Sequence, residues 1–230
     1  MPHWGMVIDL DKCTGCQSCS AACRAENSVP FAGPEQAALG RAKFWHEVLT
    51  EEIRGLYPFL ENEFVPRPCM HCVEAPCVKV CPVGATYHNQ EGVVLTNHVT
   101  CIGCRMCCTA CPYNVRVFNW YAPEFPAPLD QALNPDVPVR PNGVVEKCTF
   151  CIHRLEAAKS RAAEEGRELT DAEVVVLPAC NQACPASARY FGDLDDPEST
   201  VSRLARSPRA FQLLEDLGTH PKVYYLRRES

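Results

Sequence analysis

The chain has 230 residues, a formal net charge of -6 and 22% charged residues. This balance argues against nucleic-acid binding, which selects basic surfaces. The 47% hydrophobic content predicts a globular chain, with room for one large domain or two small domains that share a core. Cysteine is the outlier, because the 17 cysteines occur in tight groups instead of being spread as in a secreted disulfide scaffold.

The N-terminal segment, MPHWGMVIDLDKC, contains no basic n-region, no apolar h-region and no twin arginine. Because the first cysteine group already begins at Cys13, we expect no cleaved leader. No apolar run approaches the length of a membrane span, which predicts a chain that is soluble by itself. The apolar residues just before Cys13 predict a short strand.

The cysteines form four groups of four. The groups are Cys13, Cys16, Cys19 and Cys23; Cys69, Cys72, Cys77 and Cys81; Cys101, Cys104, Cys107 and Cys111; and Cys148, Cys151, Cys180 and Cys184. Three groups end in Cys-Pro, whereas Arg24 follows the last cysteine of the first group.

The third group, CIGCRMCCTACP, has the spacing C-x-x-C-x-x-C-x-x-x-C-P, which is typical of [4Fe–4S] ligation. Each iron of a cubane takes one soft thiolate, so a cluster needs four. A zinc site takes its four ligands from two pairs and does not explain such a run. Disulfides need an oxidising compartment and would leave one odd thiol. We therefore interpret the groups as iron ligands of four [4Fe–4S] clusters.

One cysteine is left over. The spacing selects Cys107 as the ligand in the third group, because using Cys108 breaks the pattern. Cys108 is then predicted to be a small buried hydrophobic residue beside the cluster.

The segments between the groups carry weaker signals. Residues 24–68 predict an irregular strand pair, with aromatic residues suited to core packing or to covering a cluster or a partner surface. GATYH and GVVLTN predict two short strands around a turn at residues 89–92. Residues 121–147 are proline-rich and predict a loop with little regular structure.

Two further elements are predicted toward the C-terminus. Residues 152–168 predict an exposed amphipathic helix. In residues 199–230, the segment TVSRLARSPRAFQLLEDLG predicts a helix in its second half, and KVYYLR predicts a final strand. This tail is interpreted as a docking element, although an ordinary closing strand explains it equally well.

In two-cluster ferredoxins, the last cysteine of each run ligates the other run's cluster. The short strand pair joins groups two and three into one unit, which leaves groups one and four to each other. Applied to these pairs, the rule gives four ligand sets. Set A is Cys13, Cys16, Cys19 and Cys184; set B is Cys23, Cys148, Cys151 and Cys180; set C is Cys69, Cys72, Cys77 and Cys111; set D is Cys81, Cys101, Cys104 and Cys107.

The predicted fold class is α+β, with two nested ferredoxin-like units. The inner unit, 69–120, is inserted into an outer unit made of 1–23 plus 148–198. Residues 24–68 and 121–147 are inserts, and 199–230 form the C-terminal helix and strand tail. SARYFGDL after Cys184 resembles YNVRVFNW after Cys111, which supports this repeat.

No catalytic residue is predicted. The chain has no G-x-G-x-x-G and no G-x-x-x-x-G-K, so it offers neither a nucleotide-binding glycine turn nor a phosphate loop. His71 and His153 lie beside ligands and are interpreted as hydrogen-bonding or packing residues. Four cations near ligands in sequence are candidates for raising cluster potentials, with most of them expected in solvent: Lys79, Arg105, Lys147 and Arg154.

The phrases IDLDKCTGCQSC, PCVKVCPVGATY, CIGCRMCCTACPYNVRVFNW and KCTFCIHR resemble the iron–sulfur subunits of complex molybdopterin oxidoreductases, the dimethyl sulfoxide and polysulfide reductase family. The resemblance covers nearly the whole chain and departs from the pattern at Arg24. It implies a non-catalytic electron-transfer subunit that passes single electrons along four [4Fe–4S] clusters. Its implied partners are a molybdopterin catalytic subunit, with molybdenum or tungsten, and an integral-membrane quinone-binding anchor.

The same resemblance implies association with a membrane through partners. The periplasmic face, reached by co-export with a partner, is slightly favoured over the cytoplasm. The alternative is a soluble polyferredoxin, or the iron–sulfur subunit of a hydrogenase or formate dehydrogenase. The long inserts and the tail favour the molybdopterin complex, because a free carrier needs little surface beyond its clusters.

Overall fold

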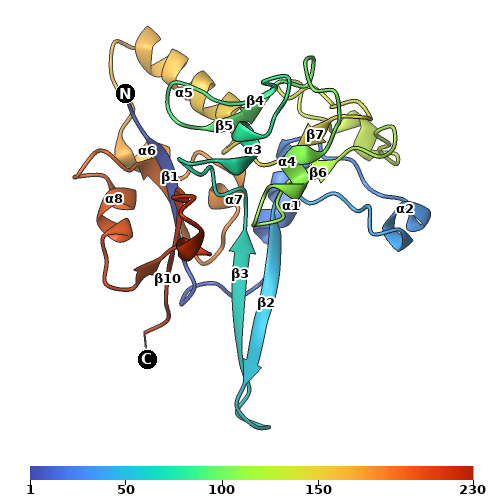
Figure 1. The fold of residues 1–230 in the computed structure, drawn as a ribbon. Helices are drawn as coiled ribbons and strands as arrows, with labels where there is room; N and C mark the ends of the chain where they lie inside the picture. The colour runs from blue at the N-terminus through green and yellow to red at the C-terminus, as the bar shows by residue number, and fades with distance from the viewer. Residues whose placement is uncertain (230) are drawn as a thin grey trace.

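The computed structural model describes residues 1–229, and the side chains of residues 51–54 and 61 lie outside the described set. A four-stranded sheet in the order β8-β1-β10-β9 joins the two ends of the chain (Figure 1). Its strands are β1 (Trp4–Asp9), β8 (Arg189–Asp193), β9 (Ala210–Phe211) and β10 (Val223–Leu226). β1 and β10 confirm the strands predicted before Cys13 and at the end of the chain.

β1 pairs antiparallel with β8 and parallel with β10, so Met6 lies between Phe191 and Val223. All six residues of β1 are buried. The strand therefore reads as a continuous apolar run, as expected for a central strand covered on both faces.

The predicted strand pair in residues 24–68 is confirmed as a long hairpin that extends from the body of the molecule (Figure 1). It consists of β2 (Glu47–Arg54) and β3 (Glu61–Arg67), and its register shifts between Glu51 and Arg54. The tip is apolar and exposed at Leu56, Tyr57 and Phe59.

The two short strands between groups two and three are also confirmed: β4 (Thr86–His88) pairs antiparallel with β5 (Val94–Thr96). Asn89 organises the turn, because its side-chain oxygen accepts hydrogen bonds from the backbone N–H groups of Glu91 and Val93 at 3.1 and 2.7 Å. The strand after Cys111 is β6 (Val117–Phe118), and it pairs with β7 (Val145–Glu146) at the end of the proline-rich insert.

The third cysteine of each group lies on a short helix. The helices and their cysteines are α1 (Ser18–Glu26) with Cys19, α3 (Pro76–Lys79) with Cys77, α4 (Met106–Thr109) with Cys107 and α7 (Ala179–Gln182) with Cys180. α1 packs against α7, and α3 packs against α4. Groups one and four therefore meet through their helices, and so do groups two and three.

The helix predicted at 152–168 is confirmed as α5 (Ile152–Glu164), which buries one face through Leu155, Ala158 and Ala162. It ends before Gly166, whose φ of 68° lies in the left-handed region that stops a helix. Other short helices are α2 (Pro34–Ala38), the 3-10 helix η1 (Leu129–Gln131) and α6 (Asp171–Val175).

The prediction for the C-terminal tail is wrong in one respect. The helix α8 (Thr200–Ala205) occupies the first half of the segment, whereas the second half contains β9 and the 3-10 helix η2 (Glu215–Leu217). Ser199 starts α8 by accepting a hydrogen bond from the N–H of Ser202 at 3.1 Å. Pro208 cannot continue a helix, and β9 pairs with β10.

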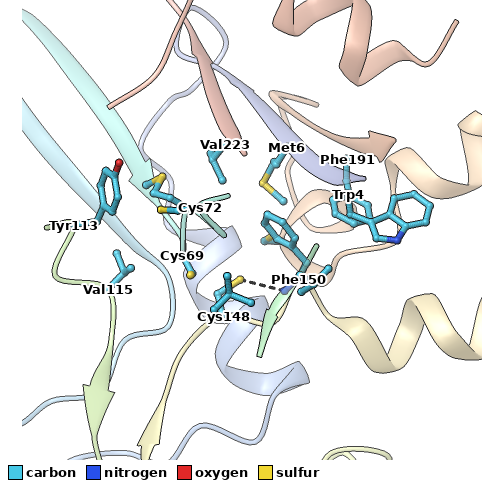
Figure 2. Packing of buried hydrophobic residues seen from close by; sticks show 14 of the residues in the cluster. Trp4, Met6, Cys69, Cys72, Tyr113, Val115, Cys148, Phe150, Phe191 and Val223 are labelled. Atoms are coloured by element: carbon cyan, nitrogen blue, oxygen red, sulfur yellow. Dashed lines mark hydrogen bonds between the residues drawn. The ribbon is translucent and has the colours of Figure 1, made fainter. Parts of the chain in front are cut away.

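One hydrophobic core connects the sheet with the cysteine loops (Figure 2). Trp4 stacks on Phe191, with 5.5 Å between ring centroids, and Phe150 meets Phe191 edge-on at 5.3 Å. Cys148 lies two residues before Phe150, so the core brings the sheet directly against a cysteine group. The sheet thereby positions the cysteines of the fourth group against those of the first.

Candidate iron–sulfur cluster sites

Cysteines from separate parts of the sequence surround three cavities. Set A lines one cavity, set C a second and set D a third. In each cavity three cysteines come from one group, and the fourth is Cys184, Cys111 or Cys81 from the partner group. Among the side chains that the structure describes, no three His, Cys, Asp or Glu are grouped as ligands of a single metal ion.

Set B is the most deeply buried, and Cys23, Cys148, Cys151 and Cys180 are all buried in the protein. Burial raises the pKa of the Cys23 thiol well above its usual value, and the other three thiols of the set raise it further. The amide of Asn27 donates toward the sulfurs of Cys23 and Cys151, at 3.7 and 3.9 Å. These four thiols, drawn from both ends of the chain, are therefore electrostatic neighbours.

The C-x-x-C segment that opens each group turns through the left-handed region at the residue before its second cysteine. The φ angles are 68° at Gly15, 43° at His71, 68° at Gly103 and 56° at Phe150. Such turns gather backbone N–H groups on the inside of a concave loop that suits an anion. Glycine adopts them without strain, whereas His71 and Phe150 need support from their surroundings.

Backbone N–H groups donate to sulfur in three of the four ligand sets, A, B and D. Phe150 donates to Cys148 at 3.4 Å, Thr86 to Cys81 at 3.5 Å and Ala188 to Cys184 at 3.4 Å. Two of these bonds come from the loop that follows a Cys-Pro pair. Hydrogen bonds to sulfur stabilise a thiolate and an anionic cluster over their neutral forms.

Comparison with known proteins points to the same chemistry. A family model described as "4Fe-4S dicluster domain" matches residues 60–126, and one described as "4Fe-4S binding domain" matches residues 4–25. The chain is 49% identical to the iron-sulfur cluster-binding subunit of menaquinone reductase from Nitratidesulfovibrio vulgaris, over 98% of this chain and 89% of the relative.

Other relatives carry the names of iron-sulfur subunits of reductases. One, from Halobacterium salinarum, is named for dimethyl sulfoxide reductase and is 45% identical over 100% of this chain and 80% of its own length. The arsenate respiratory reductase iron-sulfur subunit of a Shewanella species is 36% identical over 97% of this chain and 95% of its own length. The chain belongs to the iron–sulfur subunits of the molybdopterin oxidoreductases. The prediction of [4Fe–4S] chemistry in an electron-transfer subunit is confirmed.

The interior of this iron–sulfur subunit has an excess of positive charge. Among the residues whose burial is described, six buried cations accompany two buried carboxylates. The cations are Lys43, Arg116, Arg140, Lys147, Arg189 and Lys222, and the carboxylates are Asp9 and Glu146. Buried unpaired cations are costly, so this surplus fits anionic groups bound inside the protein. Clusters ligated by four thiolates supply that negative charge.

Sequence reasoning missed the two buried arginines nearest the thiols. Arg189 lines the cavity of set A and Arg116 lines the cavity of set C. A signal was present in the sequence, because each is the fifth residue after a cysteine that precedes proline. Of the four cations that sequence reasoning did name, only Lys147 is buried, and its ammonium donates to the carbonyl oxygens of Cys148, at 2.8 Å, and Val94.

The leftover thiol lies next to the predicted ligand. Cys108 is half-buried and packs at the edge of the core, whereas Cys107 lines the cavity of set D. A hydrogen bond with Cys108 lowers the pKa of Cys107 to about 6 and raises that of Cys108. The pair thus favours Cys107 as the thiolate and Cys108 as the protonated donor, and the choice of ligand remains a prediction.

His71 is a hydrogen-bonding and packing residue, as predicted. Its Nδ1 accepts a hydrogen bond from the N–H of Val94 at 3.1 Å, and its ring packs on Phe150. Burial lowers the pKa of His71 well below its usual value, with a smaller effect from the charge of Lys147. The ring is therefore neutral.

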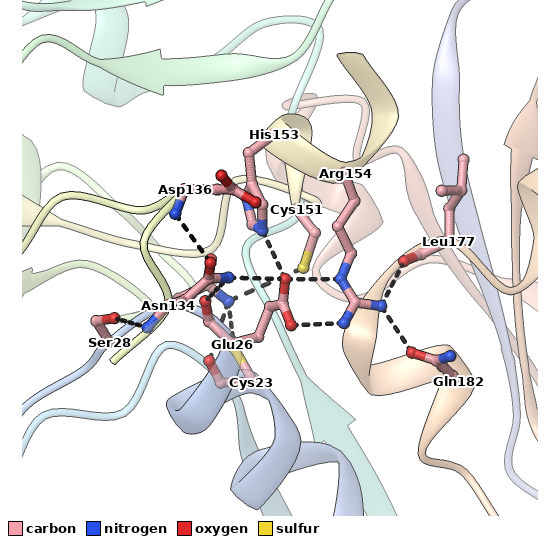
Figure 3. Close-up of polar contacts among 11 residues, drawn as sticks. Cys23, Glu26, Ser28, Asn134, Asp136, Cys151, His153, Arg154, Leu177 and Gln182 are labelled. Atoms are coloured by element: carbon pink, nitrogen blue, oxygen red, sulfur yellow. Dashed lines mark hydrogen bonds and ion pairs between the residues drawn. The ribbon is translucent and has the colours of Figure 1, made fainter. Parts of the chain in front are cut away.

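His153 also plays a supporting part. It lies 2.7 Å from the carboxylate of Glu26, which accepts two further bonds from Arg154 at 2.6 and 2.5 Å (Figure 3). Asn134 donates to the same carboxylate at 3.1 Å. This network ties the end of α1 to α5 and to the proline-rich insert, next to Cys23 and Cys151.

In the described part of the chain, no helix is long and apolar enough to cross a bilayer.

Proposed function

We propose that this subunit holds four [4Fe–4S] clusters, one in each of sets A to D, and passes single electrons along them. The observation that supports these sets is the meeting of distant cysteines around common cavities. Cys184 joins the cavity of Cys13, Cys16 and Cys19, although the whole inner part of the chain separates them. When bound, each cluster supplies a one-electron redox centre, and the protein holds it, excludes water and sets its potential.

The nested arrangement of two ferredoxin-like units is part of the same proposal. Residues 1–23 plus 148–198 make the outer unit, and residues 69–120 make the inner unit. The pairing of β1 with β8 and the packing of α1 on α7 support the outer unit. The pairing of β4 with β5 and the packing of α3 on α4 support the inner one.

The thiols also suggest the order of the clusters, A–B–C–D. Cys180 of set B raises the pKa of Cys19 of set A, in addition to the larger effect of burial. Cys69 of set C likewise adds to the effects of burial and Cys180 on the pKa of Cys148 of set B. Cys69 and Cys148 lie near each other in Figure 2, in agreement with this interaction. Sets C and D share Arg116 as a neighbour of Cys77 and Cys107.

We propose that electrons pass between a molybdopterin catalytic subunit, with molybdenum or tungsten, and a quinone-reactive membrane subunit. The names of the relatives support this complex: one belongs to a menaquinone reductase and others to dimethyl sulfoxide and arsenate reductases. A periplasmic location by co-export rests on the resemblance alone. Residues 199–230 are kept as a docking tail, although β10 is buried within the sheet.

Anaerobic purification tests the proposal. The protein is expected to contain about sixteen irons and about sixteen acid-labile sulfides per chain, four of each per cluster. It is also expected to purify with a large pterin-containing partner. Stoichiometric zinc with negligible sulfide would contradict the cluster assignment, and a chain that purifies alone with full iron would favour a soluble polyferredoxin.

A further inference from the structure

Two arginines occupy equivalent places in the two proposed ferredoxin-like units. Arg116 is the fifth residue after Cys111, and Arg189 is the fifth residue after Cys184. The backbone repeats as well, because the residue two positions before each arginine has a left-handed φ, 51° at Asn114 and 47° at Ser187. Each arginine then stands at the start of a strand, just before β6 or as the first residue of β8.

Both guanidinium groups are buried without a carboxylate partner. Arg116 is 5% exposed, and its Nη2 donates to the hydroxyl oxygens of Thr86 and Thr96 at 2.9 and 3.0 Å. Its Nε and Nη1 are buried and have no hydrogen-bond partner among the described residues. Because an unpaired buried cation is strongly destabilising, a negative charge is expected near these N–H groups.

Arg189 repeats this pattern in the outer unit. It is 4% exposed, its Nε donates to Asn181 at 3.4 Å and its Nη2 approaches the sulfur of Met6 at 3.2 Å. Its Nη1 is buried and finds no partner within the described part of the chain. Neutral contacts therefore hold the side chain in place and leave its charge uncompensated.

The surrounding thiols belong to two sets in each case. Arg116 lines the cavity of set C, and its partner Thr86 donates its backbone N–H to the sulfur of Cys81, a ligand of set D, at 3.5 Å. Arg189 lines the cavity of set A, and its partner Asn181 directly follows Cys180, a ligand of set B.

We propose that Arg116 and Arg189 are the buried counterions of the two units, each held between two clusters and raising the reduction potential of both. The inference rests on the proposed ligand sets. Reduction adds one electron, and therefore one negative charge, to a cluster that is already anionic. A fixed cation in a low-dielectric interior stabilises the reduced state more than the oxidised state.

The other two cysteine groups have a neutral residue at the equivalent position, five residues after their last cysteine. The fifth residue after Cys81 is Thr86, which accepts a hydrogen bond from Arg116, and the fifth residue after Cys23 is Ser28. Each unit therefore has one such cation for two clusters. This ratio predicts that one substitution changes two potentials and leaves the other two unchanged.

The test is a redox titration of the purified holoprotein, followed by electron paramagnetic resonance, for Arg116→Gln and Arg189→Gln. Arg116→Gln is expected to lower the potentials of the clusters of sets C and D only. Arg189→Gln is expected to lower those of sets A and B only. Signals are assigned to sets from cysteine variants such as Cys16→Ser and Cys104→Ser.

Lysine variants separate charge from packing. Arg116→Lys and Arg189→Lys keep the charge and are expected to shift the potentials less than the glutamine variants do. The lysine variants also keep the proposal testable if a glutamine variant does not fold. Lys79→Gln is the matched surface control, because Lys79 lies between ligands of sets C and D but is exposed and paired with Glu74 at 2.6 Å. It is expected to leave all four potentials unchanged.

Three results would overturn the proposal: unchanged potentials in a glutamine variant of full iron content, an equal shift of all four clusters, or a lysine variant that shifts as far as glutamine. Failure of the proposed function itself is recognised separately, because the unsubstituted protein would then lack four clusters by iron and sulfide analysis.

Discussion

The imidazole ring of His71 stacks on the phenyl ring of Phe150, with 3.7 Å between the centroids and 25° between the planes. Both residues precede the second cysteine of a C-x-x-C segment, and both have the left-handed φ that glycine supplies at Gly15 and Gly103. The two segments that lack glycine thus support each other across the boundary between groups two and four. At these two positions the ring stack, a tertiary contact, supports the left-handed backbone that glycine adopts without help elsewhere.

Substitutions of His71 should separate its backbone conformation from its stacking. His71→Asn keeps a residue that tolerates a left-handed φ and an acceptor for the N–H of Val94, so it should lose only the stack, about 0.5–1.5 kcal/mol. His71→Val adds backbone strain and a buried unpaired N–H, and should cost about 2–5 kcal/mol. The temperature at which cluster absorbance bleaches measures both. Equal losses would show that neither the φ angle nor the hydrogen bond matters.

The ligand sets can be tested by pairing distant cysteines. Cys184→Ser should perturb the same paramagnetic signal as Cys16→Ser, because both line the cavity of set A. It should leave the signal sensitive to Cys151→Ser nearly intact, since loss of a thiolate acts most strongly on its own cluster. If Cys184 instead shares its signal with Cys148 and Cys151, the nested arrangement is wrong.

The two adjacent cysteines of the third group should behave differently. Cys108→Ser should keep all four clusters, with at most a small packing loss, because Cys108 does not line the cavity of set D. Cys107→Ser should lose one cluster or convert it to a three-iron form. Iron analysis and the spectrum of the oxidised protein distinguish these outcomes, and the reverse behaviour would move the ligand assignment by one residue.

Gly15 should not accept a side chain. A Cβ atom at this position would lie 2.6 Å from the ring of Phe64, and its φ of 68° is strained for alanine. Gly15→Ala should therefore cost about 1–3 kcal/mol and reduce occupancy of set A, measured by iron content and its paramagnetic signal. Gly33→Ala is the matched control, because nothing lies within 4 Å of its added Cβ atom and it should leave both unchanged.

The sequence by itself determined the chemistry of this protein and most of its local elements. The spacing of cysteines within a run indicates iron ligation, because one short loop must reach neighbouring irons. The strand before Cys13, the hairpin in residues 24–68 and the turn at Asn89 follow from alternation and turn residues, which are also local signals. The helix predicted in the second half of the TVSRLARSPRAFQLLEDLG segment is wrong, because a non-local interaction decides the structure there. The pairing of β9 with β10 outweighs the local helix propensity.

The tertiary structure decided what depends on residues far apart in the chain. It brings Cys184 to the cavity of Cys13, and it buries Arg116 and Arg189 where sequence reasoning had named other cations. Composition cannot reveal which cation is buried, because arginine and lysine are usually exposed and only the surrounding fold removes their water. The left-handed turns at His71 and Phe150 are of the same kind, because only the stack between two distant segments supports a conformation that neither residue prefers on its own.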